Sequence, residues 1–402
     1  MKQAVMYGAG NIGRGFIGQL FQMSGYEVVF VDVNREVVEQ LNRDRQYPIY
    51  ITDGDTYREY PVTGVRAVDG RDPDAVATEI AHAEIMATAV GVGVLKFIAE
   101  PIARGVQKRM EQKIDAPLNI IVCENMIGAD KFLADTVKSY LDEREKIYFD
   151  SHVATVEPSI GRMVPATPKE LLERNRLAVC VEPFCELPVD RDAFLGEIPD
   201  IVNLQPFSPF DFHIRRKLFL HNMSHALTAY FGAYREYTYI WEAIMDQEIK
   251  KLARCALSEI SLALSAEYSV PLSELLDFSE ELLVRYENKL LGDTVERVGK
   301  DTKRKLAPND RFVAAARLCE KHGIVPANIL SGLAAGLHFA PVGDSASEEV
   351  VQSIKENGLI HTLSTFCGIE ESSPFVPCIE RIYRKIESHD DLRDICTSLQ
   401  NN

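Results

Sequence analysis

The sequence predicts an α/β protein of two domains, in which a parallel sheet with helices is followed by an all-α domain. The chain has 402 residues, more than one hydrophobic core usually supports. In the first half, short apolar runs alternate with segments of helical period, which is typical of βαβ units. After about residue 190, almost every segment has helical period. The expected domains are residues 1–193 and 194–402.

The periodicity of the apolar residues also predicts individual elements. Strands are expected over residues 3–7, 27–33, 84–90 and 118–125, and helices over 11–24 and 95–111. Residues 56–68 predict a small polar hairpin or an excursion from the sheet, and residues 148–189 a further strand-rich piece. The Pro-rich stretch 197–212 is typical of a connector, beyond which 239–264 and 310–323 are clear helical segments.

The composition excludes several classes of function. The net charge of −16 argues against nucleic acid as a partner, because phosphate binding needs a basic face. No run of 18 apolar residues is present, and the start of the chain lacks the apolar core of a signal peptide, so neither a membrane span nor secretion is expected. The eight cysteines form no CxxC pair, which favours reduced thiols in a cytoplasmic protein.

A glycine motif follows the first expected strand. Gly8, Gly10 and Gly13 form GxGxxG between an apolar strand and a helix. In this context the first glycine permits a tight turn, the second lets a pyrophosphate approach the backbone, and the third allows close packing of helix and strand. The second strand ends in Asp32, where the ribose hydroxyls of a dinucleotide would be bound. The motif predicts a Rossmann-type domain.

Asp32 also indicates which dinucleotide binds. A carboxylate there accepts hydrogen bonds from a 2′-OH and repels a 2′-phosphate, so NAD is expected rather than NADP. Arg35 lies nearby and is interpreted as a solvated charge at a helix start. The small residues after the fourth strand would let the nicotinamide half lie against backbone. The expected cofactor-binding residues are Gly8, Ala9, Gly10, Asn11, Ile12, Gly13, Asp32, Ala89, Val90 and Gly91.

The candidate catalytic residues lie in the segment 215–232, which has helical period. At 100° per residue, Lys217, His221, Asn222 and His225 share one broad face of a core-like helix. Dehydrogenation of an alcohol needs a base, donors for the alkoxide and groups that orient the substrate. A lysine whose pKa is lowered by burial, an asparagine and a histidine can supply these. A merely solvated polar stripe explains the same pattern equally well.

The spacing of His221 and His225 also suggests a metal site. Two histidines at i and i+4 lie on one helical face. The sequence offers no third ligand at a telling spacing, and HNMSH lacks the glutamate of the zinc-protease motif. No metal is therefore expected.

Four segments together resemble the polyol-specific long-chain dehydrogenases of the mannitol dehydrogenase family. They are YGAGNIGRGFIG (7–18), CENM (123–126), RRKLFLHNMSHALTAY (215–230) and DTVERVGKDTKRKL (293–306). The resemblance spans most of the chain in the same order. It implies a zinc-independent enzyme with an NAD-binding N-terminal domain, a helical C-terminal domain and the substrate in the cleft between them.

The resemblance also implies roles for particular residues. The family's K-x4-N-x2-H pattern falls on Lys217, Asn222 and His225. In the family the lysine is the general base. Asn222 forms half of an oxyanion hole, and the asparagine of the strand-end motif, here Asn125, forms the other half.

The segment 293–306 is implied to lie near the substrate. Arg297 is the expected substrate contact, and Arg304 with the adjacent lysines supplies positive charge suited to a phosphate. A solvated basic loop is the alternative interpretation. Two positions depart from the family pattern: Gly161 replaces an aspartate that can meet the substrate, and Thr302 replaces a proline. Both departures bear on substrate identity.

The expected reaction is reversible hydride transfer between NAD and a sugar alcohol phosphate, with mannitol 1-phosphate and fructose 6-phosphate as the first pair to test. One alternative is the same chemistry on an unphosphorylated polyol or a hexuronate such as fructuronate. Another is an NAD-binding regulator without turnover. A monomer and a homodimer are both compatible with the sequence.

Overall fold

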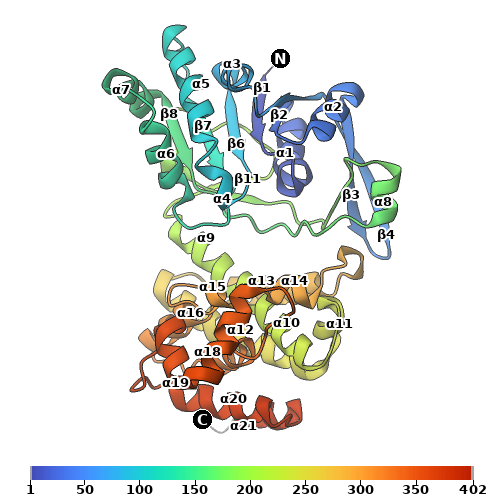
Figure 1. The fold of residues 1–402 in the computed structure, drawn as a ribbon, viewed down its shortest axis with the longest axis vertical. Coiled ribbons are helices and arrows are strands. Elements are labelled where there is room, and N and C mark those ends of the chain that lie inside the picture. The colour runs from blue at the N-terminus through green and yellow to red at the C-terminus, as the bar shows by residue number, and fades with distance from the viewer. Residues whose placement is uncertain (1, 400–402) are drawn as a thin grey trace. The chain divides into compact units, whose positions relative to one another are not determined.

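The computed structural model describes residues 2–399 and divides the chain into two compact units. Unit 1 is Met1–Ile214 and unit 2 is Arg215–Asn402 (Figure 1). The division falls within helix α9 (Asp211–Arg216), somewhat beyond the boundary at residue 193 that the sequence suggested. No helix of the described residues is both long enough and apolar enough to span a membrane.

Unit 1 is built on a six-stranded sheet in which all neighbouring strands are parallel. Its strands, in spatial order, are β5 (Val65–Asp69), β2 (Glu27–Asp32), β1 (Gln3–Tyr7), β6 (Ile85–Thr88), β7 (Leu118–Val122) and β8 (Val153–Val156). Counted along the chain within this sheet, the order is 3-2-1-4-5-6, that of the doubly wound dinucleotide-binding fold. The expected parallel sheet is confirmed.

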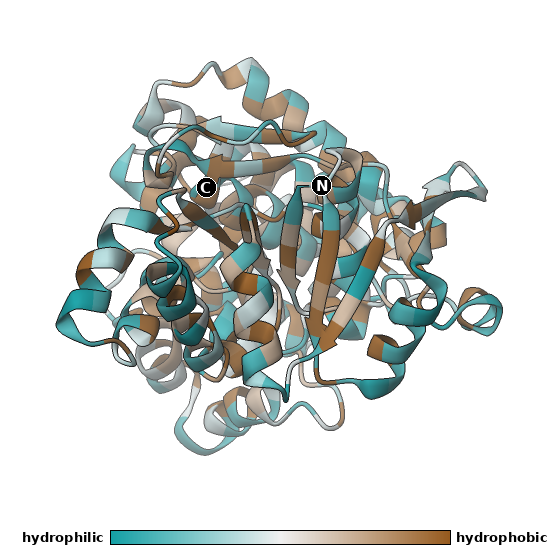
Figure 2. Ribbon diagram, turned by 90° about the horizontal axis from the view of Figure 1, so that it is seen from above, coloured by the Kyte–Doolittle hydropathy of each residue, from teal (hydrophilic) through white to brown (hydrophobic). Residues whose placement is uncertain are grey.

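Both faces of this sheet are covered, and the side chains of β1 alternate between two hydrophobic cores. Ala4 and Met6 pack into one core with residues before and within α1 and α2, whereas Val5 and Tyr7 pack into the other with residues of α3, α5, α6 and α7. Strands buried on both faces read as continuous apolar runs, which is how they appear in the sequence (Figure 2). The helices of unit 1 are α1 (Gly18–Met23), α2 (Arg35–Asp44), α3 (Pro73–His82), α4 (Val92–Leu95), α5 (Ala99–Glu111), α6 (Ala129–Lys138), α7 (Glu143–His152) and α8 (Lys169–Arg174).

The expected hairpin at 56–68 is only partly present. Residues Thr56–Thr63 form β4, which pairs antiparallel with β3 (Gln46–Asp53), but Val65–Asp69 joins the main sheet as β5. The break is at Gly64, whose φ of +68° turns the chain between the two strands. β3 also pairs with β9 (Val179–Val181), giving a second, three-stranded sheet.

The strand-rich piece expected over 148–189 begins later than predicted. Its first residues belong to α7, because Asp142 and Glu145 form a capping box that starts a helix there. The strands that follow are β8, β9 and β10 (Leu187–Asp190), and β10 pairs with β11 (Leu204–Phe207) inside the expected connector.

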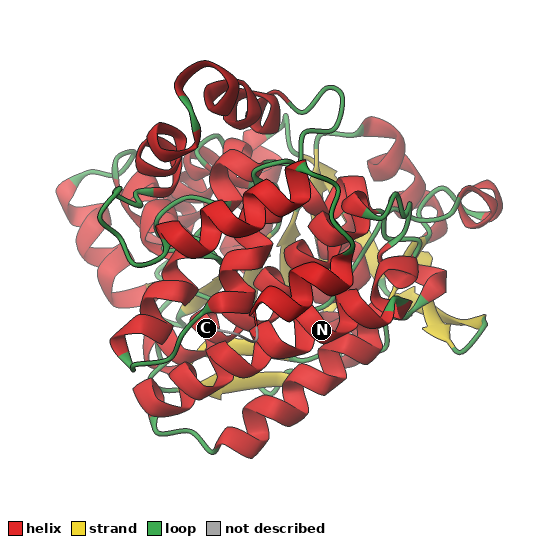
Figure 3. Ribbon diagram, turned by 90° about the horizontal axis from the view of Figure 1, so that it is seen from below, coloured by secondary structure: helices red, strands yellow, loops and turns green. Residues whose placement is uncertain are grey.

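The regular elements of unit 2 within the described residues are helices joined by loops, as expected (Figure 3). Its central helix α10 (Met223–Tyr234) is buried along most of its length and packs against α12, α14 and α17. Its other helices are α11 (Ile240–Met245), α12 (Gln247–Tyr268), α13 (Leu272–Tyr286), α14 (Val295–Gly299), α16 (Val313–Lys321), α17 (Ala327–Gly336), α18 (Ser345–Asn357), α20 (Val376–Glu387) and α21 (Leu392–Leu399). Short turns are α15 (Thr302–Lys305) and α19 (Leu359–Thr362).

Candidate active site

The glycine turn of unit 1 has the geometry that a dinucleotide needs. Gly8 follows β1 with a φ of +104°, and a Cβ there would lie 2.4 Å from the carbonyl oxygen of Ala89. A Cβ on Gly13 would lie 1.9 Å from the carbonyl oxygen of Gly8. Next to Gly10, by contrast, the space is open, with no atom within 4 Å of the Cβ position. Two glycines therefore allow the chain to fold tightly, and the third leaves room for a pyrophosphate.

Asp32 is tied directly to this turn. One carboxylate oxygen accepts a hydrogen bond from the backbone N–H of Ala9 at 2.7 Å, and the other from that of Asn34 at 2.8 Å. Arg14, a residue that the sequence analysis did not single out, donates from Nε to the carbonyl oxygen of Ala9 at 2.6 Å and also binds the carbonyl oxygen of Leu177. The turn is thus braced by an anion on one side and a buried cation on the other, while Arg35 is exposed at the start of α2.

The segment after β6 is braced by a second unpredicted residue, Glu124. Its two carboxylate oxygens accept hydrogen bonds from the backbone N–H groups of Val90 and Gly91, both at 2.8 Å. Burial raises the pKa of Glu124, although these bonds oppose the shift. The motif CENM could have pointed to Glu124, but only the contact with residues 90 and 91 gives it a role. The next residue, Asn125, is exposed.

In unit 2, the predicted catalytic segment begins with a π-helical stretch, Lys217–Asn222, that continues into α10. In a π-helix the backbone bonds join residues i and i+5, which is the separation of Lys217 and Asn222. The side chains of these two residues therefore lie more nearly on the same face of the helix than the 100° spacing of an α-helix predicts. Lys217, Asn222 and His225 are all half-buried.

His225 belongs to a polar network that the sequence did not reveal. Its Nε2 lies 3.2 Å from Oδ2 of Asp293, and its ring stacks on that of Tyr286 with centroids 4.8 Å apart. Oδ1 of the same aspartate pairs with Arg297, with Nη2 at 2.6 Å. Burial lowers the pKa of His225 despite the opposing effect of Asp293, so the ring is neutral at pH 7. Burial alone would raise the pKa of Asp293, but His225 and Arg297 outweigh it and lower that pKa.

His221 is a residue of the protein interior. Burial lowers its pKa well below the usual value, and the positive charge of Arg285 acts in the same direction. The hydroxyl of Tyr286 donates to its backbone carbonyl oxygen at 2.9 Å. Between residues 2 and 399, no group of three or more His, Cys, Asp or Glu side chains is arranged to hold a metal ion.

The basic segment is largely ion-paired. Arg304 binds Asp301 at 2.6 Å, and Lys303 binds Glu349 at 2.7 Å. Lys305 is buried, and its Nζ donates to the carbonyl oxygen of Val298 at 2.5 Å. Burial lowers the pKa of Lys305 to about 7, with the nearby arginines acting in the same direction. The charge that the sequence suggested for a phosphate is therefore mostly balanced by carboxylates or withdrawn from solvent.

The two departures from the family pattern have local explanations. A Cβ at Gly161 would meet the ring of Phe184 at 3.3 Å, so a larger residue needs that ring to move. The backbone N–H of Thr302 donates to Oγ of Ser347 at 3.0 Å, a bond that proline has no hydrogen to make.

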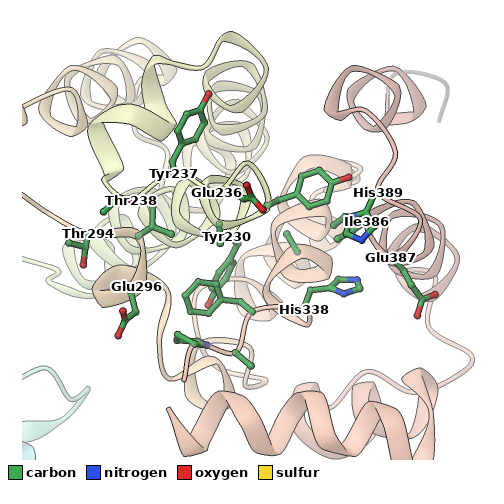
Figure 4. A pocket seen from close by; sticks show the side chains of 17 residues that line it. Tyr230, Glu236, Tyr237, Thr238, Thr294, Glu296, His338, Ile386, Glu387 and His389 are labelled. Carbon is green, nitrogen blue, oxygen red and sulfur yellow. The ribbon is translucent and has the colours of Figure 1, made fainter. Parts of the chain in front are cut away.

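A cavity of about 830 Å³ opens elsewhere in unit 2, among the ends of α10, α14, α17 and α20 (Figure 4). Aromatic and polar side chains line it, including those of Tyr230, Tyr237 and His338. None of the predicted site residues is among its lining. Thr294 and Glu296 line the cavity, whereas Asp293 and Arg297 of the same segment belong to the His225 network.

A parallel sheet of this order, with an open glycine turn at the end of its first strand, is the fold of dinucleotide-dependent dehydrogenases. Unit 2 adds a lysine, an asparagine and a histidine on one helical segment, which are groups that an alcohol dehydrogenase needs besides its cofactor. Fold and site together define an oxidoreductase acting on an alcohol carbon.

Comparison with known proteins identifies the family of oxidoreductases to which the chain belongs. The family described as "Mannitol dehydrogenase Rossmann domain" matches residues 2–203, and "Mannitol dehydrogenase C-terminal domain" matches residues 209–383. A mannitol-1-phosphate 5-dehydrogenase from Thermoanaerobacter pseudethanolicus is 35% identical over 387 residues, covering 96% of this chain and 98% of its own. The chain belongs to the mannitol dehydrogenase family.

Solved structures share the fold at much lower identity. Pseudomonas fluorescens mannitol 2-dehydrogenase, in a ternary complex with NAD and D-mannitol, is similar with a TM-score of 0.78 and 16% identity, covering 100% of this chain and 94% of that one. A D-sorbitol dehydrogenase in substrate-free form has a TM-score of 0.81 and 14% identity, with coverages of 96% and 93%.

Proposed function

We propose that the protein catalyses the reversible, NAD-dependent interconversion of D-mannitol 1-phosphate and D-fructose 6-phosphate. The observation that carries the proposal is the match at 35% identity to a mannitol-1-phosphate 5-dehydrogenase, which extends over nearly the whole of both chains. The free cysteines and the net charge of −16 support a cytoplasmic enzyme that binds no nucleic acid. A monomer and a homodimer remain the two proposed assemblies.

The cofactor-binding residues are proposed as the sequence predicted them. The backbone at Gly10 lies open to a pyrophosphate, and Asp32 stands where a ribose 2′-OH would donate to it. The negative charge of Asp32 would repel a 2′-phosphate, which favours NAD. Backbone at Ala89, Val90 and Gly91 would flank the nicotinamide half. When bound, NAD supplies the acceptor for the hydride that leaves the alcohol carbon.

The chemical roles in unit 2 follow from the groups present. Lys217 takes the proton of the reacting hydroxyl during oxidation and returns it during reduction. The side-chain amide of Asn222 donates to the oxygen on which negative charge develops, and Asn125 is proposed as a second donor to that oxygen. His225 and Arg297 bind the remaining polar groups of the substrate, and Arg304 is proposed to assist with the phosphate.

The same chemistry on an unphosphorylated polyol or a hexuronate is the second candidate. The ion pairs of Arg297 and Arg304 favour it, because cations balanced by Asp293 and Asp301 attract a phosphate dianion less strongly. An NAD-binding regulator without turnover is a weaker alternative, since the lysine, asparagine and histidine of the catalytic segment are all present.

One assay separates these candidates. The purified protein is incubated with NADH and, in turn, with fructose 6-phosphate, fructose and fructuronate, and NADH oxidation is followed by absorbance. The proposal predicts the highest kcat/KM with fructose 6-phosphate. A higher value with fructose or fructuronate would replace the proposed substrate, and no oxidation with any of the three would favour a regulator.

A further inference from the structure

We infer that Asp293 is a positioning residue of the active site, which holds the ring of His225 and the guanidinium of Arg297 so that each presents a fixed group to the substrate. This inference rests on the proposed function, because it deepens the substrate-binding role given to those two residues. Asp293 was not among the residues that the sequence singled out, since a single aspartate before a helix carries no signal of its own.

The contacts of Asp293 show that one carboxylate serves two residues. Oδ2 lies 3.2 Å from Nε2 of His225 on α10. Oδ1 accepts from Nε of Arg297 at 2.7 Å and lies 2.6 Å from its Nη2. Such a two-pronged arginine–carboxylate pair fixes orientation as well as distance. Asp293 therefore couples a residue of the catalytic helix to a residue of α14.

The aspartate is itself held rigidly. Its side chain is only 7% exposed, and its backbone carbonyl oxygen accepts from the N–H of Ile240 at 2.9 Å. The next residue, Thr294, caps α14 and forms a bridge with Tyr239. A carboxylate on such a fixed backbone, and buried away from water, is stable only while its charge is paired. The guanidinium of Arg297 provides that pairing, and the neutral ring of His225 lies against the other carboxylate oxygen.

The contact with Asp293 also determines which nitrogen of His225 carries the proton. Nε2 of the neutral ring lies 3.2 Å from the ionised Oδ2 of Asp293, which favours the proton on Nε2, although the two atoms do not meet the geometry of a hydrogen bond. Nδ1 is then an acceptor, suited to a substrate hydroxyl. The stacked ring of Tyr286 keeps the imidazole from turning over.

For Arg297, the pairing with Asp293 fixes which edge of the guanidinium can face a ligand. Nε and Nη2 are used by Asp293, so Nη1 is the part of this half-exposed side chain that is left for a ligand. The two N–H groups of Nη1, held at a fixed angle, suit an oxygen of the substrate. Asp293 therefore supplies orientation to both residues without itself reaching the reacting atoms.

A double-mutant cycle tests the coupling. Asp293→Asn keeps the shape of the side chain but removes its charge and one acceptor. We expect kcat/KM to fall about 10- to 100-fold, as is typical when a residue that orients a functional side chain is lost. NADH affinity should stay unchanged, because the network lies outside unit 1. In a background carrying both His225→Ala and Arg297→Ala, the same change should cost less than about 2-fold, since its targets are gone.

The matched control is Glu296→Gln. Glu296 lies on the same short helix, is exposed and has no ion-pair partner within residues 2–399, so its substitution should leave kcat/KM unchanged. The cycle is run with whichever substrate of the assay panel the wild type reduces best. An independent loss of about 10-fold or more from Asp293→Asn in the His225→Ala, Arg297→Ala background would overturn the inference.

A second measurement needs no substrate. In ¹⁵N-histidine spectra of the wild-type protein at pH 7, with His225→Gln used to assign the resonance, we expect His225 to carry its proton on Nε2. A proton on Nδ1 would contradict the inference even if the proposed substrate is correct. If no substrate is turned over, this measurement still tests the contact between Asp293 and His225.

Discussion

The glycine turn of unit 1 and the His225 network of unit 2 position polar groups by opposite means. In the turn, the groups offered to a ligand are backbone amides, and three glycines within six residues create the space for it. In the network, the groups are side chains: the ring of Tyr286 from α13 and the carboxylate of Asp293 contact His225, and Arg297 of α14 pairs with that carboxylate. A backbone site is local in the sequence, whereas a side-chain site depends on how distant segments pack. Side-chain atoms added to the glycine turn should therefore disrupt cofactor binding, whereas the His225 network should be disrupted by the loss of a charge.

The largest effect is expected from the base. Lys217→Ala should lower kcat by about 10²- to 10⁴-fold, the usual contribution of a general base. The oxidation rate of the wild type should rise with pH through one ionisation that the variant lacks. A variant with near-normal kcat and an unchanged pH profile would show that Lys217 is only a solvated residue of its helix.

A smaller effect is expected at the ribose position of unit 1. Asp32→Ala removes the charge that repels a 2′-phosphate and also the acceptor that fixes the Ala9 amide. KM for NAD should rise about 10-fold or more, and the preference for NAD over NADP should narrow. The comparison is kinetic, with both cofactors at a saturating concentration of substrate. If NAD binding stays tight and NADP use does not change, the ribose assignment is wrong.

Arg304→Ala should have a modest effect that depends on the substrate. Its charge is balanced by Asp301 at 2.6 Å, so we expect KM for fructose 6-phosphate to rise only about 3- to 10-fold. KM for an unphosphorylated ketose should not change. Arg254→Ala, which breaks a comparable exposed pair with Glu280, is the control. Equal losses for both substrates would mean that the segment has a structural role.

The smallest effect concerns stability and pH in unit 2. Glu259 is half-buried and accepts hydrogen bonds from the backbone N–H groups of Asn328 and Ile329 at 2.9 and 3.0 Å. Burial raises its pKa from 4.5 to about 7. The folded state then binds a proton that the unfolded state releases, so stability should fall as pH rises from about 4.5 to 7. The Tm of Glu259→Gln should lack this decline, and a parallel decline in both proteins would assign it to other groups.

The same contrast between local and distant interactions explains which parts of the fold could be predicted from the sequence. The sheet and the glycine turn were predictable because apolar runs and glycine spacing act over a few residues. The prediction for residues 56–68 was wrong in treating them as one hairpin, because Gly64 adopts a left-handed conformation and separates two strands of different sheets. The π-helical stretch beginning at Lys217 was not predictable, because nothing in its composition distinguishes it from an α-helix.

The residues that brace the sites were missed for a related reason. Glu124 and Asp293 gain their roles only from partners that the fold brings to them, at Val90 and Gly91 for the first and at His225 for the second. Arg14 directly follows the last glycine of the motif, yet its buried contact with Leu177 depends on a turn 163 residues away, just before β9. Sequence spacing therefore locates the groups that act on a ligand better than the groups that hold them.

In the proposed function, unit 1 binds the cofactor and Lys217 of unit 2 moves the proton. The most direct test is the dissociation constant of NADH for Lys217→Ala, measured by fluorescence titration beside the wild type. We expect the same dissociation constant for NADH in both proteins, although the variant has lost turnover. A dissociation constant raised 10-fold or more in the folded variant would contradict that division of roles.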